Sequence, residues 1–265
     1  MDNLLAVVTI GAYAIALSQI LPRLIQGQPI ATLRSFLIAM IAVTLHGFLL
    51  KNAIFQEANG NLSLLNVASL VSFLISLSTT LAIFKWRIWF LLPTAYSFAI
   101  LNILTTLIFA HSTLAHLETQ TRSLLHISLA LFSYSTLMIA TLYVLQWRWL
   151  NHKLKQKKDL HINPNIPPLM IIEKQLFRLI LLGNALLTIT LMTGWLSLEQ
   201  LWGTGKAHKM VLSCAAWVIY NILLWGYYYQ GWRGRKITTL SLLGAILLTL
   251  AYFGSRFIQE ILIHH

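Results

Sequence analysis

Residues 123–147 read SLLHISLALFSYSTLMIATLYVLQW, a run of 25 residues without a single Asp, Glu, Lys or Arg. About 20 mostly apolar residues in a helix are enough to cross the hydrocarbon core of a bilayer. Inside hydrocarbon every backbone N–H and C=O must be hydrogen-bonded, and a helix achieves this within one segment. The stretch therefore predicts a transmembrane helix.

The same pattern recurs along the whole chain. Eight apolar runs can be delimited, at residues 3–21, 33–50, 62–84, 88–110, 123–147, 174–197, 207–229 and 237–260. The sequence of 265 residues is 57% hydrophobic and 10% charged, whereas soluble domains usually carry about 25% charged residues. We therefore expect an all-α integral membrane protein, a bundle of eight transmembrane helices forming one domain over residues 1–265.

Basic residues are divided unevenly between the connections. Of the 19 Lys and Arg residues, 14 lie in or beside the first, third, fifth and seventh connections, and the other side has only Lys51, Arg122, Lys206, Lys209 and Arg256. Because cytoplasmic loops are enriched in Lys and Arg, both termini are predicted on the outer, periplasmic face of an inner membrane. Residues 148–173, which hold a basic run and three prolines, are predicted to form a cytoplasmic loop against anionic headgroups.

Composition excludes several functions. The net charge of +12 follows the loop pattern and is not expected to mark a nucleic-acid site. Cys214 is the only cysteine, so no disulfide or thiolate cluster can form within the chain. The sequence has no P-loop, no carboxylate near the middle of a predicted helix and no evident hydrolytic triad. We expect no catalysed reaction.

Histidine is the residue type that stands out, with nine in the chain. His46 lies about one turn below the outer end of the second predicted helix, and His126 lies at a similar depth in the fifth. Two neutral imidazoles at matched depth on different helices can ligate a haem iron from both axial sides. Alternatively, histidines at helix ends can bond to water or headgroups, and both interpretations are open at this point.

Further polar residues extend the candidate site. His208, at the start of the seventh helix, and His116, in an outer connection, are additional cofactor-binding candidates, and the outer basic residues could pair with haem propionates. A zinc site is a weaker prediction, because the usual close-spaced histidine pairs are missing. Four intramembrane asparagines are expected to form interhelical hydrogen bonds: Asn66, Asn102, Asn184 and Asn221.

Residues 124–135, LLHISLALFSYS, resemble the histidine-bearing helix of the cytochrome c assembly family, which includes the haem-handling CcsA proteins and the shorter HemX-like proteins. The resemblance covers nearly the full length and includes residues 62–67 (LSLLNV), 231–235 (GWRGR) and 251–254 (AYFG). In CcsA-type members the histidine that matches His126 is an outer axial ligand for haem, which implies that role here. The second outer ligand of the family follows the last helix, where His264 is the nearest candidate.

One segment departs from the family pattern. Haem-presenting members have a tryptophan-rich stretch that ends in Trp-Asp and is followed by Pro-Lys. This chain instead reads WGTGKAHK at residues 202–209, so the aromatic platform and its acid are missing. The inner-side ligand of the family also has no counterpart in residues 223–227.

The resemblance and the histidines together predict a haem-binding or haem-handling membrane component of cytochrome c biogenesis, embedded in lipid and working with other maturation proteins. Two alternatives are a permease subunit or small-molecule transporter without its own ATPase, and a scaffold that organises other membrane proteins. Stoichiometric haem would favour the first reading, and substrate flux without haem would favour the transporter.

Overall fold

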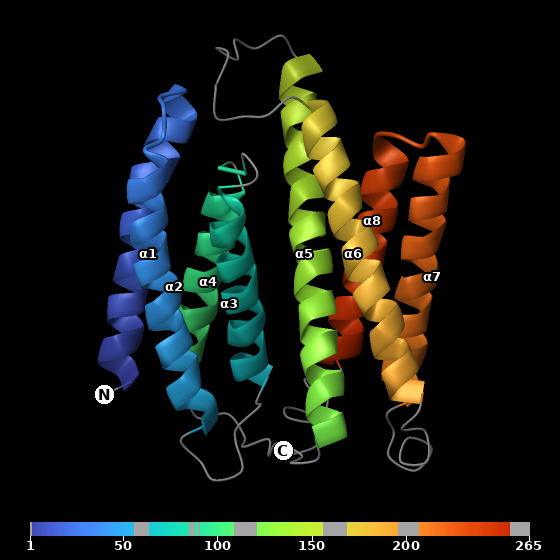
Figure 1. The fold of residues 1–265 in the computed structure, drawn as a ribbon, viewed down its shortest axis with the longest axis horizontal. Coiled ribbons are helices and arrows are strands. Elements are labelled where there is room, and N and C mark those ends of the chain that lie inside the picture. Colours follow the sequence, from blue (N-terminus) through green and yellow to red (C-terminus); the bar gives the residue numbers. More distant parts are fainter. Residues whose placement is uncertain are drawn as a thin grey trace. The chain divides into compact units, whose positions relative to one another are not determined.

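A computed structural model describes residues 2–55, 64–84, 88–89, 91–108, 121–155, 169–195 and 207–254. All its regular elements are helices (Figure 1), in the order α1 (Asp2–Gln26), α2 (Thr32–Phe55), α3 (Leu64–Ala82), α4 (Leu92–Ile108), α5 (Thr121–Lys155), α6 (Leu169–Trp195), α7 (Ala207–Gln230) and α8 (Arg235–Thr249), which continues as a π-helix η2 (Leu250–Gly254). The all-α class is thus confirmed over the described residues.

Seven helices in this part of the chain are long and apolar enough to cross a membrane, and α4, with 17 residues, is shorter. Large apolar side chains also cover the outside of the helices, as at Leu4, Ile41, Phe48 and Leu101. Water would penalise such a surface, whereas lipid tails do not. An integral membrane protein follows, while the eighth crossing and the outward termini stay predictions.

Helix boundaries differ from the predicted ones where charge or proline intervenes. α1 continues through Pro22 to Gln26 and stops at Gly27, whose φ of 68° ends a helix readily. α5 reaches Lys155 and α6 begins at Leu169, so both helices extend into the predicted loop of residues 148–173. Hydropathy marks the membrane boundary, but Lys and Arg are good helix formers and let a helix continue into water.

The chain divides into two compact units. The first contains α1 to α4, which pack as a closed ring in which α1 contacts α2 and α4, and α3 contacts the same two helices. Its core combines small apolar residues with buried polar ones, including Tyr13, His46, Ser72, Thr80 and Tyr96. Buried polar groups in a membrane protein hold helices together and have to be bonded to one another.

The second unit contains α7, α8, η2 and nearly all of α5 and α6. Ser133 of α5 donates to the Gly183 carbonyl of α6 at 3.0 Å, and Trp217 Nε1 of α7 donates to Thr188 Oγ1 of α6 at 2.8 Å. The Tyr134 and Thr249 hydroxyls, 3.0 Å apart, join α5 to α8. Hydrogen bonds made by side chains therefore connect all four helices of this unit.

The predicted asparagine contacts are confirmed in part. Asn184 Nδ2 donates to Asn221 Oδ1 at 3.2 Å between α6 and α7, and Asn66 Nδ2 donates to the Ala53 carbonyl of α2 at 3.4 Å. Asn102 instead donates to the Phe98 carbonyl of its own helix at 2.9 Å. This bond lies within α4, so the contact of Asn102 is not the interhelical one that was expected.

Candidate functional site

His126 lies in the second turn of α5 and is half-buried. Its Nδ1 atom is 2.9 Å from Oγ1 of Thr193, which is near the end of α6. The two residues are 67 positions apart in sequence but belong to the same compact unit. The antiparallel neighbours α5 and α6 thus place a hydroxyl beside the imidazole.

The direction of this hydrogen bond fixes the tautomer of His126. Thr193 Oγ1 donates to the Thr190 carbonyl at 2.9 Å, and a carbonyl oxygen can only accept. A hydroxyl has one hydrogen, so while Thr193 donates to Thr190 it accepts from His126. In that arrangement Nδ1 carries the proton, and Nε2 keeps the lone pair that a metal ligand needs.

Gly194 lies next to the imidazole ring of His126 and leaves room for it, because glycine has no β-carbon. A β-carbon at this position would lie 3.1 Å from His126 Cε1 and 3.9 Å from Nε2. Contacts of about 3.1 Å between carbon atoms are well inside the optimal 3.5–4.0 Å, so a larger residue would press on the imidazole. Thr193 and Gly194 together set the orientation of His126, and neither was among the residues predicted from the sequence.

An aromatic cluster lies farther along α5. The ring centroid of Tyr134 is 5.4 Å from that of Tyr252 and 5.8 Å from that of Phe253, both in η2. Such spacings are typical of favourable aromatic pairs. π-helical turns occur frequently at functional sites. The aromatic cluster is therefore of functional interest, and it belongs to the same unit as His126. The sequence indicated these residues only through family resemblance.

His46 has different surroundings, in the first unit. Its side chain is fully buried in α2, with Nδ1 3.2 Å from the Tyr13 hydroxyl and Nε2 3.0 Å from Ser69 Oγ. The ring of Phe73 packs edge-on against it, with centroids 5.6 Å apart. Both nitrogen atoms of His46 are therefore hydrogen-bonded, and iron ligation there requires one of these partners to be replaced.

The predicted pairing of His46 with His126 stays a prediction, since the two histidines belong to separate units. Among the other candidates, His208 is exposed near the start of α7, and His116 and His264 lie outside the described residues. Of the outer basic residues, Lys51 is exposed and Lys209 is partly buried. No group of three or more His, Cys, Asp or Glu residues that could hold a metal ion occurs in the described ranges.

Comparison with known proteins places these residues in a family context. The family described as "Cytochrome C assembly protein" matches residues 34–263. The chain is 41% identical to "Inner membrane protein YpjD" of Escherichia coli (strain K12) over 259 residues, which is 97% of this chain and 98% of that protein. The resemblance seen in the sequence is thereby confirmed.

More distant relatives match about half of the chain. "Cytochrome c biogenesis protein CcsA" of Prochlorococcus marinus (strain AS9601) is 24% identical over 155 residues, covering 51% of this chain and 50% of that protein. The protein of the same name from Chlamydomonas reinhardtii is 28% identical over 142 residues, covering 52% and 38% respectively. No solved structure gives a significant match.

These similarities agree with the helical architecture. Membrane-length helices and near full-length similarity to an inner membrane protein identify a multi-pass protein of the inner membrane. The family match covers α2 to η2 and includes both His46 and His126. On this evidence the chain belongs to the cytochrome c assembly protein family.

Proposed function

We propose that the protein binds haem through His126 and handles it as a membrane component of cytochrome c maturation, without catalysing a reaction itself. The observation that carries this proposal is the hydrogen-bond chain from His126 Nδ1 through Thr193 to the Thr190 carbonyl. Relatives named cytochrome c biogenesis proteins and the family match support the biological setting.

The donor chemistry of His126 fits haem iron. Metal-ligating histidines almost always donate their other ring N–H to an oxygen acceptor, which fixes the ring and raises its basicity. Thr193 supplies this acceptor, and the neutral Nε2 is the type of ligand that proximal histidines provide in haem proteins. When bound, haem would supply the iron centre that is to be transferred or presented to partner maturation proteins.

The remaining candidates have subordinate roles in the proposal. His46 is the preferred second axial ligand from the sequence, with His208 and His116 as further candidates. Ligation by His46 would replace its bond to Ser69 or to Tyr13. The outer lysines Lys51 and Lys209 stay candidates to pair with the propionates, because charge-assisted bonds between ammonium and carboxylate groups are strong.

The test is the haem content of the full-length protein, purified in mild detergent from haem-sufficient cells. A pyridine haemochrome assay should give stoichiometric haem with low-spin bands, and His126→Ala should remove or shift the Soret band. His152→Ala is the matched control, since His152 is an exposed histidine near the other end of α5. A haem-free protein that also fails to take up added haem would overturn the proposal and favour a permease subunit.

A further inference from the structure

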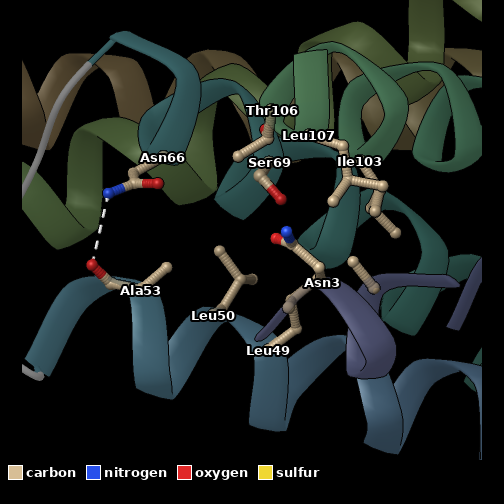
Figure 2. Close-up of a pocket in the computed structure, with 10 residues that line it drawn as sticks. Asn3, Leu49, Leu50, Ala53, Asn66, Ser69, Ile103, Thr106 and Leu107 are labelled. Atoms are coloured by element: carbon tan, nitrogen blue, oxygen red, sulfur yellow. Dashed lines mark hydrogen bonds between the residues drawn. The ribbon is translucent and has the colours of Figure 1, made fainter. Parts of the chain in front are cut away.

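A cavity of about 130 Å³ lies within the first unit, where α1 and α3 begin and α2 and α4 end (Figure 2). By the predicted topology, this is its outer end. The residues that matter for the argument are Asn3, Ala6, Ala53, Asn66, Ser69 and Thr106, which come from all four helices. Neither His126 nor His46 is among the described lining residues, although His46 is bonded to Ser69 in the wall, so the cavity needs its own explanation.

The size of the cavity limits the occupant. An engineered apolar cavity of about 150 Å³ in another protein binds benzene, so the present volume suits one six-membered ring. Leucine and isoleucine side chains form much of the wall, at Leu49, Leu50, Leu107 and Ile103. An apolar ring with few substituents therefore matches both the space and its lining.

The polar groups of the wall are neutral. They are the amides of Asn3 and Asn66 and the hydroxyls of Ser69 and Thr106, and none of the lining residues that the structure describes is charged. In Figure 2 the polar ends of Asn3 and Ser69 point toward each other, whereas Asn66 turns to the Ala53 carbonyl. A charged ligand would lose hydration without gaining a counter-ion, so a neutral ligand with hydrogen-bonding oxygen is favoured.

Ser69 also connects the cavity to buried proton-carrying groups. Its Oγ is 3.0 Å from His46 Nε2, and His46 Nδ1 is 3.2 Å from the Tyr13 hydroxyl. All three side chains can donate or accept, so the chain has two possible directions. When His46 donates to Ser69, the serine hydrogen is free to donate to a ligand oxygen; in the opposite direction, Ser69 Oγ can accept from the ligand.

Because Ser69 can either donate or accept, the cavity suits a ligand whose oxygen accepts hydrogen bonds in one chemical form and donates them in another. A quinone presents carbonyl oxygens that accept, and the corresponding quinol presents hydroxyls that donate. Both forms are neutral, contain one six-membered head-group ring and dissolve in the bilayer. From size, neutrality and the Ser69–His46–Tyr13 chain, we propose that this cavity binds the head group of a membrane-soluble quinone or quinol.

The test is calorimetric titration of the full-length protein, purified in detergent and depleted of lipid quinone, with a short-chain benzoquinone. Saturable one-to-one binding is expected. Ala6→Leu and Ala53→Leu, which fill the cavity, should each weaken binding more than tenfold, and Ser69→Ala should weaken it about fivefold through loss of one hydrogen bond. Ala14→Leu adds the same volume on the exposed side of α1 and should leave affinity unchanged.

Comparison of ligands completes the test. The corresponding quinol should bind with similar affinity, and toluene, which has the ring without the oxygen, should bind at least tenfold more weakly. Absence of saturable binding, equal affinity for toluene, or unchanged binding in both filling variants would overturn the proposal. The titrations use haem-free protein, in which His46 keeps its bond to Ser69. His126→Ala should then bind the quinone like the unmodified protein, so failure of the haem proposal and failure of this one are distinguishable.

Discussion

Gly194 lies directly against the imidazole of His126, where a β-carbon would lie only 3.1 Å from Cε1. We expect Gly194→Ala to push the ring away from its acceptor and to lower haem occupancy about threefold to tenfold, since outer-shell changes at metal sites commonly cost this much or more. The measurement is haem per protein by pyridine haemochrome. Gly11→Ala is the matched control, because a β-carbon there would meet nothing within 4 Å; equal loss in both variants would contradict the prediction.

Thr193→Val keeps the shape of the side chain but removes the acceptor for His126 Nδ1. We expect about tenfold faster loss of haem to an apo-globin acceptor and a change in reduction potential, because the tautomer is no longer fixed. Thr193→Ser restores the hydroxyl and should restore both properties. A valine variant with unchanged haem release and potential would show that this hydrogen bond does not tune the ligand.

His46→Leu tests the first unit. The substitution leaves the hydroxyls of Tyr13 and Ser69 without their bonds to the ring, so we expect a loss of about 2 kcal/mol in the free energy of unfolding. The thermal unfolding midpoint in detergent should fall, whereas Thr44→Val, at an exposed position of the same helix, should change it little. If His46 is also an axial ligand, the low-spin haem bands will change in the same sample.

Gly183→Ala tests how closely α5 and α6 approach. A β-carbon at Gly183 would lie 2.6 Å from Cγ and 2.7 Å from Cδ2 of Leu137, so the helices would have to separate. We expect destabilisation of about 1–3 kcal/mol, the usual cost of overpacking. Leu137→Ala makes room for the methyl group, and the double variant should lose less stability than the two single variants together. Strict additivity of the three unfolding midpoints would contradict the steric explanation.

Much of the fold could be predicted from the lengths of the apolar runs, because a segment that crosses a bilayer has to be helical and has to reach a minimum length. The same signal failed at the end of α5, where charged residues from Arg148 continue the helix beyond the apolar part to Lys155. Asn184 and Asn221 were each expected to make an interhelical hydrogen bond, since a polar amide in hydrocarbon needs a partner, and the structure shows that they bond to each other. Asn102 donates to a carbonyl one turn away in its own helix. The sequence alone does not distinguish such an intrahelical bond from an interhelical one.

The candidate site was predictable only in its histidines. His126 could be selected by residue type and depth, and family resemblance gave the same residue. Its partners Thr193 and Gly194 are separated from it by two helices' length of chain, and nothing in their local sequence indicates the pairing. Likewise, the bonds that occupy both nitrogens of His46 depend on packing among α1, α2 and α3. Residue type suggests a role, but only packing determines which atoms are available for it.

The π-helical turn η2 has a consequence for aligning this chain with its relatives. A π-turn accommodates one residue more than an α-helical turn, and each extra residue rotates the following side chains by about 100°. Tyr252 and Phe253, which both approach Tyr134, lie in this turn. A relative that lacks one residue here would retain a regular helix and present different side chains to α5. An insertion or deletion within residues 250–254 should therefore be treated as a change in which side chains of the helix face α5. Residues after this turn should be aligned with such a relative after a shift of one position.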